Sequence, residues 1–394
     1  MAVLSIESRP GTAADAVAGL VPSEVVRPRD VAEVVEALRT AAERGHSVVP
    51  VGSGSKTGWA ARPTGCDLVV ETTGLDRVVE HTPGDLVVIA EAGVRLEALQ
   101  TQLAAAGQML ALDPADVGTT LGGLVSANAS GPRRLRYGTV RDLLIGVTVV
   151  LADGDIASAG GKVVKNVAGY DLGKLYTGAH GSLGVVVSTT WRLHPLPVAH
   201  AVVLVGVCDA AEAGRFRQAV ANSTLTPTAC ELARVGGELH LAVLFEAIAE
   251  SVAHQSQALV KLLGTGEITD ALPSWFGQRP GGPGDLVLRL AYEPAALTVV
   301  LDALPSSAAL TASACTGVAY VALPAEQGAA DLPGLRSRLT AYDGTVVCLQ
   351  VPEAVRGQVD HWGPVGDSLE LMGRVKDRFD PHRRLSPGRF VGGL

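Results

Sequence analysis

The first residues with a pattern suited to chemistry form a glycine- and serine-rich loop, GSGSKTG, at 52–58, directly after an apolar run. Successive backbone N–H groups in such a loop can cradle a diphosphate. The spacing departs from the Walker loop because Ser55 precedes Lys56, and from G-x-G-x-x-G because Thr57 stands where the third glycine belongs. The loop therefore predicts phosphate binding, with a plain surface loop as the open alternative.

A second candidate is the run PADVGTTLGGLVSANASGP at 114–132. Core packing favours bulky side chains, so the adjacent Gly122 and Gly123 among other small residues indicate a backbone that approaches a ligand closely. Thr119 and Thr120 can cap a short helix whose N-terminus would favour a phosphate. We interpret the run as a ligand-binding segment; a tight helix–helix crossing is the alternative.

The third candidate runs from Lys162 to Arg192. A helix carrying Tyr170 and Leu175 is predicted to lead into glycine-rich turns at 178–184 and then into a valine-rich strand. This arrangement is typical of a lid over the edge of a ligand. The catalytic residues stay unassigned: Tyr170 and His180 are the candidates, and a structural role is the alternative for both.

Other chemistries find little support. The chain has no G-x-S-x-G, H-E-x-x-H or C-x-x-C motif, and its nine histidines lack ligand spacing. The five scattered cysteines indicate reduced thiols and argue against a zinc or iron–sulfur site in this chain. A basic cluster at 133–136 could hold an anionic substrate or cofactor phosphates, or form a solvated turn. We expect no metal.

The elements that must position these segments alternate between helix and strand in the first half. Asp30 can cap a helix that stops at Gly45, and Arg95–Ala106 is a second helix closed by Gly107. A domain boundary is predicted at His194-Pro195-Leu196-Pro197. After it the sequence consists of β-rich and helical runs, with one glycine-rich turn at 280–284 that we expect to be exposed. Further strands are predicted at 47–51, 67–71, 77–81, 86–91, 144–151, 155–159, 184–193, 201–207, 239–244, 286–291 and 319–323, and a last helix at 367–379.

Composition limits the function classes. The chain has 394 residues, and 32 Lys+Arg against 40 Asp+Glu give a net charge of −8, so a nucleic-acid partner is not expected. Its longest apolar stretch has ten residues, Leu143 to Ala152, whereas a spanning helix needs about 20. The start, MAVLSIESRP, lacks the basic region of a secretory signal. We expect a cytoplasmic protein that reaches the inner face of the cell membrane only peripherally, through partners.

Taken together, the three segments indicate one protein family more specifically than any of them does alone. The Val51–Gly58 loop, the T-x-G-G-x-x-x-x-N-x-x-G run from Thr120 and K-N-V-A-G-Y-D-L at 165–172 resemble the FAD-binding domain of the PCMH/vanillyl-alcohol-oxidase flavoproteins. More narrowly, G-P-R-R (131–134), V-R-D-L (140–143) and the terminal S-P-G-R (386–389) are similar to the FAD-binding E subunits of bacterial glycolate oxidase.

This resemblance implies an α+β fold: a PCMH-type FAD-binding domain of two subdomains at 1–197, a smaller α+β cap domain at 198–365, and a C-terminal segment at 366–394 that returns to the FAD domain. FAD would lie between the subdomains, noncovalently, because the first loop lacks the histidine that covalent members use. The implied cofactor-binding residues are Val51, Gly52, Ser53, Gly54, Ser55, Lys56 and Thr57 at the diphosphate; Pro114, Thr119, Thr120, Gly122, Gly123, Leu124, Ala127, Asn128 and Ser130 around the isoalloxazine; and Gly184, Val185 and Val186 at the adenine.

The resemblance also implies oxidation of glycolate or a similar 2-hydroxy acid, with a catalytic flavoprotein subunit and an iron–sulfur subunit as partners. Complete relatives carry an H-x-G-D-G-N-type segment and paired cap histidines, which are missing here, and Ser386 replaces a family asparagine. Three hypotheses follow: an FAD-binding subunit of such a complex, a self-sufficient 2-hydroxyacid (D-lactate-type) dehydrogenase with an unrecognised base, or a structural subunit with vestigial flavin loops.

Overall fold

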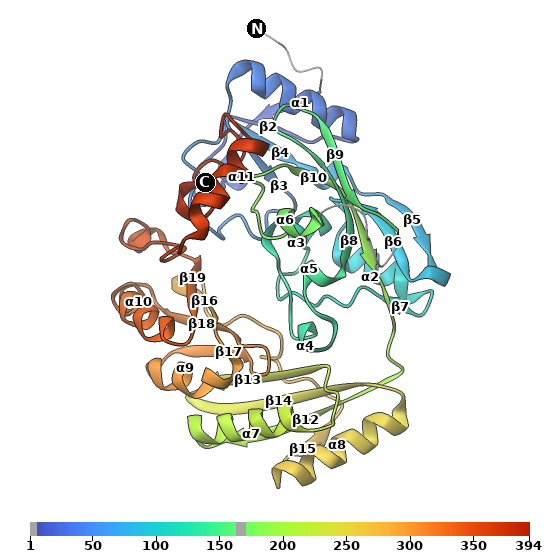
Figure 1. Ribbon diagram of the computed structural model, residues 1–394, viewed down its shortest axis with the longest axis vertical. Helices are drawn as coiled ribbons and strands as arrows, with labels where there is room; N and C mark the ends of the chain where they lie inside the picture. Colours follow the sequence, from blue (N-terminus) through green and yellow to red (C-terminus); the bar gives the residue numbers. More distant parts are fainter. Residues whose placement is uncertain (1–5, 163–170) are drawn as a thin grey trace.

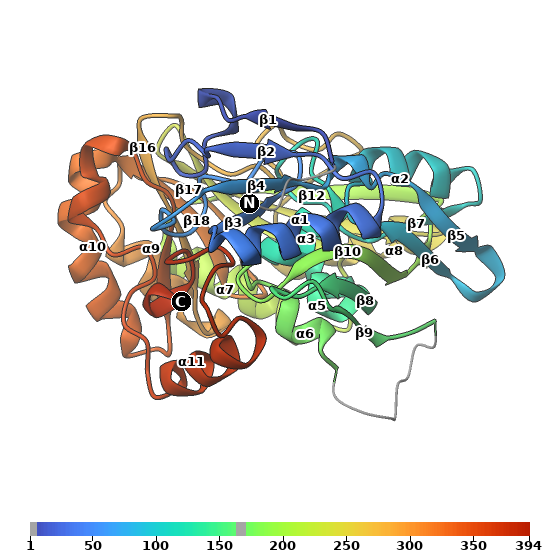
Figure 2. The ribbon, with the colours of Figure 1, turned by 90° about the horizontal axis from the view of Figure 1, so that it is seen from above.

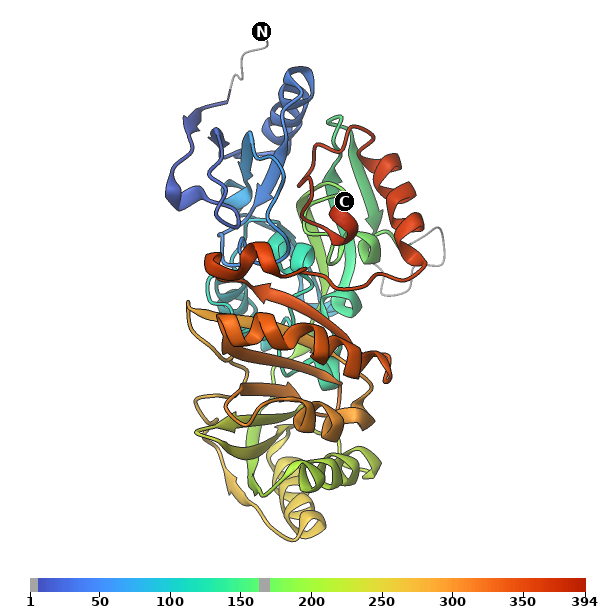
Figure 3. The same ribbon diagram turned by 90° about the vertical axis from the view of Figure 1, so that its left-hand side faces the viewer.

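The computed structural model describes residues 6–162 and 171–394. The molecule is elongated: residues before about 197 and the C-terminal tail form one end, and a large sheet with its helices forms the other (Figure 1). A view turned by 90° shows the same stacking of the two ends, with the C-terminal helix on the outside of the first (Figure 3). In the described part of the chain, no helix combines the length and apolar character needed to cross a membrane.

The first sheet is built around three parallel strands. Helix α1 (Val31–Arg44) links two of them and buries Val34 and Leu38 against the sheet. The predicted helix signals are confirmed, because the Asp30 side chain accepts a hydrogen bond from the Glu33 N–H and Gly45 ends the helix with φ +66°. The sheet order is β1 (Ser8–Pro10), β2 (Glu24–Val26), β4 (Leu68–Glu71), β3 (Val48–Val51), with β1 antiparallel to β2.

The second sheet is antiparallel and packs against the first. On its central strand, Val185 and Val187 point into the core shared with α1, while Val186 belongs to the opposite core. Both faces are buried, which explains the uninterrupted valine run. The order is β5 (Val78–Thr82), β6 (Val87–Glu91), β10 (Val185–Arg192), β8 (Leu144–Val150), β9 (Ile156–Gly160); α2 (Leu96–Ala104), α3 (Leu121–Ala127), α4 (Arg134–Tyr137), α5 (Val140–Leu143), α6 (Gly173–Tyr176) and the pair β7 (Gln108–Met109) and β11 (His194–Pro195) accompany it.

The third sheet is antiparallel and has two different faces. Cys230 and Leu232 point into a large apolar core with the helices, whereas the alternate residues of the same strand face the first half of the molecule. The order within the described residues is β15 (Glu267–Thr269), β12 (Ala199–Val207), β14 (Glu238–Ala247), β13 (Ala229–Val235), β17 (Ala309–Ser313), β18 (Val318–Pro324), β16 (Asp285–Ala291), β19 (Thr345–Gln350), with α7 (Ala210–Asn222), α8 (Ala249–Leu263), α9 (Leu297–Ala303) and α10 (Ala325–Thr340).

The C-terminal tail returns to the first half. Helix α11 (Ser368–Phe379) lies beside the first two sheets (Figure 2), and Leu385 forms a parallel bridge with Val48 of β3. A fully buried ion pair holds the turn after the helix: Lys376 Nζ lies 2.7 Å from Asp380 Oδ2 and donates to the Ser182 and Leu385 carbonyls. The tail is therefore attached by specific polar contacts as well as by packing.

Candidate functional site

The loop after β3 lines a partly open cavity between the first two sheets, which we call the loop cavity; its empty space, open mouth included, is about 680 Å³. Many of the predicted residues meet there, from the loop itself, from α3 and from the start of β10. A wider hollow of about 1490 Å³ shares part of the loop and adds Arg27, Glu71 and Arg95. The loop cavity is lined by Val17, Val49, Pro50, Val51, Gly52, Ser53, Gly54, Ser55, Lys56, Thr57, Thr72, Thr120, Gly122, Gly123, Ser126, Ala127, His180, Val186 and Arg389.

Small residues are needed where the loop meets α3. The Thr120 side chain caps α3 by accepting a hydrogen bond from the Gly123 N–H at 3.3 Å, as the sequence predicts. A Cβ atom on Gly52 would lie 2.1 Å from the same Thr120 oxygen, and one on Gly122 would lie 2.9 Å from the Ala92 methyl group. Gly52 and Gly122 therefore permit close packing, whereas Gly123 borders the cavity.

Two polar groups at the loop cavity lack a counterpart. The Ser53 hydroxyl oxygen is buried and has no hydrogen-bond partner. Arg389 is 4% exposed and donates to the Thr57 and Trp59 carbonyls, yet it forms no ion pair with any described residue. Burial lowers the pKa of Arg389 to about 10. A buried cation and an unpaired hydroxyl are costly unless a ligand satisfies them, so the cavity suits an anion such as a diphosphate.

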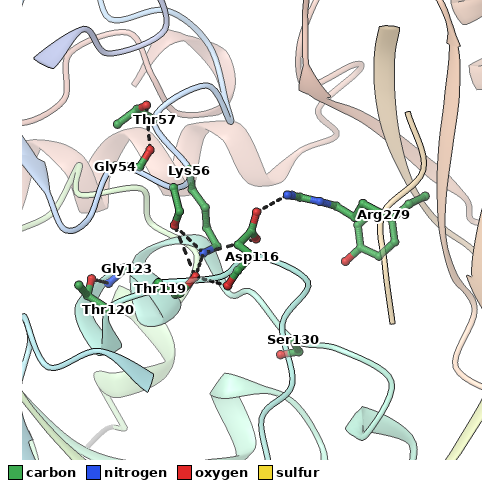
Figure 4. Close-up of polar contacts among 12 residues, drawn as sticks. Gly54, Lys56, Thr57, Asp116, Thr119, Thr120, Gly123, Ser130 and Arg279 are labelled. Atoms are coloured by element: carbon green, nitrogen blue, oxygen red, sulfur yellow. Dashed lines mark hydrogen bonds and ion pairs between the residues drawn. The ribbon is translucent and has the colours of Figure 1, made fainter. Parts of the chain in front are cut away.

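Lys56 points from the loop toward Thr119 and Asp116 (Figure 4). Its Nζ donates to Thr119 Oγ1 at 2.7 Å and lies 3.5 Å from Asp116 Oδ2, and Asp116 also pairs with Arg279. The guanidinium of Arg279 lies 4.7 Å from the centre of the Trp59 ring. Burial lowers the pKa of Lys56, an effect that Asp116 partly offsets. This network connects the loop to the segment before β16.

A second, narrower space lies where the third sheet meets the first half, and we call it the interface chamber; its empty space, open mouth included, is about 400 Å³. Glu231 of β13 is 5% exposed there, and Ser313 of β17 donates a hydrogen bond of 2.6 Å to its Oε1. Burial raises the pKa of Glu231 to about 7. The chamber is lined by Trp59, Pro114, Ala115, Asp116, Ala129, Ser130, Gly131, Pro132, Arg134, Glu231, Gly277, Gln278, Arg279, Thr311, Ser313 and Tyr320.

The remaining predicted residues fall into three groups. Pro114 and Ser130 line the interface chamber rather than the loop cavity, and Thr119 is fully buried beneath Lys56. Leu124 of α3 and Val185 of β10 are core residues that pack on opposite faces of the second sheet. Asn128 and Gly184 line neither space. Asn128 ends α3 with φ +47°, and Gly184 lies against Val149 and Val150.

The third predicted segment is described only in part. Tyr170 lies outside the described residues, and the predicted helix is, in its described part, the single turn α6. His180 has φ +51°, donates its N–H to the Ser126 carbonyl and packs its ring edge-on against Trp362. Burial, with a smaller contribution from Arg389, lowers the pKa of His180 to about 3. The imidazole is therefore neutral near pH 7.

The arginines at 133–136 make contacts in two different places. Arg133 forms a bidentate pair with Glu246 of β14, at 2.7 and 3.1 Å, and Arg136 donates to the carbonyl of the same residue. Arg134 instead borders the interface chamber, 3.5 Å from the Tyr320 hydroxyl. Burial also raises the pKa of Asp113, which accepts a hydrogen bond from the Arg133 N–H, to about 7. The cluster therefore joins the halves and adds charge to the chamber.

Three residues of these spaces were not singled out from sequence. Glu231 is an acidic residue in an otherwise apolar strand, which is a usable signal. Arg279 directly precedes the turn at 280–284, which is largely exposed as expected, and its own side chain reaches inward to Asp116. Arg389 belongs to the quoted S-P-G-R motif. Its hydrogen bond to the Thr57 carbonyl could not be predicted, because the two residues lie far apart in the sequence. In the described residues, no group of three or more His, Cys, Asp or Glu is placed to hold a metal ion.

Comparison with known proteins agrees with this geometry. Residues 22–160 match the family model described as an FAD binding domain. The chain is similar to glycolate oxidase subunit GlcD of Bacillus subtilis (strain 168), 34% identical over 177 residues, which cover 45% of this chain and 38% of that protein. It is also similar to glycolate oxidase subunit GlcE of Escherichia coli (strain K12), 40% identical over 117 residues, 29% of this chain and 33% of the other.

A D-lactate dehydrogenase of Archaeoglobus fulgidus is 35% identical over 171 residues, which cover 43% of this chain and 38% of that enzyme. The matches span less than half of the length of these curated relatives. Among solved structures, an alkyldihydroxyacetonephosphate synthase superposes with a TM-score of 0.69 at 15% identity, covering 93% of this chain and 76% of that one. The predicted α+β, PCMH-type fold and FAD as the cofactor are thereby confirmed.

Proposed function

We propose that this chain is the FAD-binding subunit of a glycolate oxidase-like complex, takes part in the oxidation of glycolate to glyoxylate, and passes electrons to partner subunits. The observation that carries the proposal is the loop cavity with its uncompensated Arg389 and unpaired Ser53, next to an interface chamber that holds Arg134 and Glu231. The names of the relatives GlcD and GlcE support a 2-hydroxy acid as substrate and a complex as the working form.

In this proposal residues 1–197 form the FAD-binding domain, 198–365 the cap, and 366–394 the returning segment. Backbone N–H groups of Val51–Thr57 would hold the diphosphate, and Arg389 would neutralise part of its charge. The isoalloxazine would lie along Thr120–Ala127, toward Pro114 and Ser130, and the adenine near Gly184–Val186. The fit rests on the unpaired Ser53 oxygen and on Gly123, which borders the loop cavity and adds no side chain to it.

Bound FAD supplies a two-electron acceptor, which no side chain provides. The chain's own residues bind and orient the substrate. Partial burial of the interface chamber strengthens the attraction between Arg134 and a substrate carboxylate. The partners proposed for electron exit are a sister flavoprotein and an iron–sulfur protein, recruited at a surface of this chain.

A second candidate, a self-sufficient dehydrogenase of 2-hydroxy acids, is favoured by one observation. Glu231 is a buried carboxyl in the interface chamber that no structural ion pair engages among the described residues. A carboxylate in that position could act as the base that the sequence had left unassigned. The relatives named D-lactate dehydrogenase, which the chain matches over 43–47% of its length, agree with this form.

The proposal is tested by isolating the tagged chain from its own cells and assaying the eluate. We expect bound FAD, a second flavoprotein and an iron–sulfur protein, and reduction of an artificial dye when glycolate is added. Dye reduction by the chain alone would support the self-sufficient form instead. A chain that isolates alone, takes up no FAD and reduces no dye with glycolate, D-lactate or D-2-hydroxyglutarate would contradict both and leave the structural-subunit hypothesis.

A further inference from the structure

We propose that Glu231 is the catalytic base of the interface chamber: its carboxylate accepts the hydroxyl proton of a small 2-hydroxy acid whose own carboxylate is held by Arg134. The inference rests on the proposed function in its self-sufficient form, in which this chain oxidises the acid itself. The observation behind it is the placement of one buried carboxyl and one arginine without an acidic partner, from different halves of the molecule, in the same space.

The position of Glu231 follows from strand alternation. Its neighbours Cys230 and Leu232 point into the apolar core of the third sheet, so Glu231 points to the opposite face, where the chamber lies. Ser313, its register partner on β17, donates to Oε1 at 2.6 Å. No hydrogen bond from another described residue reaches Oε2, so that oxygen is available to a ligand.

Arg134 supplies the opposite charge. Its guanidinium donates to the Gly131 and Ser130 carbonyls and lies near the Tyr320 hydroxyl, but it forms no ion pair with a described carboxylate. A substrate carboxylate is the partner such a group lacks. In a 2-hydroxy acid the hydroxyl is one carbon away from the carboxylate, so an acid held by Arg134 presents its hydroxyl within the same small chamber.

The groups around Glu231 bring the pKa of its carboxyl close to neutral pH. Burial raises its pKa to about 7, while the Ser313 hydrogen bond and the charge of Arg134 oppose that effect and Asp113 adds to it. The other charged or titratable groups that line the chamber are Arg279 and Asp116 of the connecting network and Tyr320 of β18. On the side of the third-sheet core, Tyr292, Cys230 and Cys315 lie close enough to interact with the charge of Glu231. A base with a pKa near the working pH is the most effective proton acceptor.

The step balances. The substrate carbon loses a hydride equivalent to the FAD that the proposed function supplies, the hydroxyl proton passes to the Glu231 carboxylate, and the acid becomes a 2-oxo acid. Glu231 then returns its proton to solvent when the product leaves.

The test compares Glu231→Gln with the wild-type holoprotein and uses oxalate, which binds like a 2-hydroxy acid but cannot be oxidised. Because an ionised Glu231 repels a dianion, wild-type affinity for oxalate should fall as pH rises through 7, and Glu231→Gln should bind oxalate equally well at every pH. The same variant should retain FAD and reduce it with glycolate or D-lactate at least about a hundredfold more slowly in a single anaerobic turnover.

Glu246→Gln is the matched control, since Glu246 is an equally buried carboxyl on the same sheet but pairs with Arg133 outside the chamber. It should keep the pH dependence of oxalate binding and most of the reduction rate. Equal losses in both variants, or unchanged reduction in Glu231→Gln, would overturn the proposal. If no 2-hydroxy acid reduces the wild-type flavin while oxalate still binds with the expected pH dependence, the self-sufficient function fails together with the role of Glu231 as base, although its place at an anion site stands.

Discussion

At the scale of single residues, the loop cavity is defined by what its side chains lack. Arg389 is buried without an acidic partner, Ser53 has no hydrogen-bond partner, and Gly123 adds no side chain to the cavity wall. Each of these features is costly or unexplained in an empty protein and is accounted for by a bound dinucleotide. They therefore give the most direct mutational tests of the cofactor site.

Replacing Arg389 by Met should weaken FAD binding by about tenfold to a hundredfold, because a charge-assisted hydrogen bond contributes about 1.5–3 kcal/mol. Titration calorimetry of the apoprotein with FAD measures the change. Arg383→Met is the control, since Arg383 is exposed and pairs with Asp377 at the surface. Unchanged FAD affinity in Arg389→Met would remove Arg389 from the site.

Replacing Gly123 by Trp should abolish FAD retention while leaving a folded chain. A Cβ atom there meets only the Thr120 hydroxyl, at 3.0 Å, so the indole would extend into the loop cavity. Gly58→Trp is the control, because Gly58 has open space around it and lies outside the cavity lining. The flavin-to-protein ratio from the visible spectrum is the measurement, and full occupancy in Gly123→Trp would contradict the placement.

At the scale of elements, the C-terminal tail is part of the cofactor site. Arg389 reaches the loop only because α11 and the turn after it are fixed to the first half by Lys376 and Asp380. The tail lies more than 300 residues from the loop in sequence, yet the two share a cavity. Loss of the tail's attachment should therefore affect both stability and FAD binding.

Lys376→Met should lower the free energy of unfolding by about 3–5 kcal/mol, because it leaves the Asp380 carboxylate buried without a counter-charge. Denaturant unfolding of the apoprotein measures this. Lys174→Met, which breaks the exposed pair with Asp171, should cost less than about 1 kcal/mol. Similar costs for the two variants would mean that the buried pair does not hold the tail.

At the scale of the whole molecule, two buried carboxyl groups with raised pKa values, Glu231 and Asp113, lie at the interface between the halves. Glu231 and Asp113 both have a pKa raised to about 7 by burial, whereas in the unfolded chain they would ionise near their ordinary values. Between those values and 7 the folded state holds protons that the unfolded state has released. The stability contributed by these groups is therefore present at low pH and is lost as pH rises to 7.

The difference in unfolding free energy between wild type and Glu231→Gln should consequently fall as pH increases from 4.5 to 7, by up to about 3 kcal/mol for a shift of this size. Taking the difference removes the opposing contribution of His180, which stays neutral in the folded protein while the unfolded chain takes up a proton below pH 6.5. Denaturant titrations at several pH values measure it. A difference that is flat with pH would show that folding does not raise the pKa of Glu231.

Sequence reasoning reached the parts of this molecule that depend on local interactions. The Asp30 cap, the Gly45 stop, the Thr120 cap and the valine strand were all predictable because their physical causes lie within a few residues. The interface chamber was not, because Arg134, Glu231, Arg279 and Tyr320 come from distant segments and meet only when the third sheet packs against the first half. The cofactor class came from the resemblance of motifs, not from the spacing of any one of them.

The most direct test of the central claim is the visible spectrum of the purified, FAD-loaded chain under anaerobic conditions, before and after glycolate or D-lactate is added. The account predicts that the chain takes up FAD and shows oxidised flavin bands, because the loop cavity suits the cofactor. Bands that persist with both acids would support the subunit form, and bands that bleach would support the self-sufficient form with Glu231 as the base. A folded chain that takes up no FAD would contradict the account.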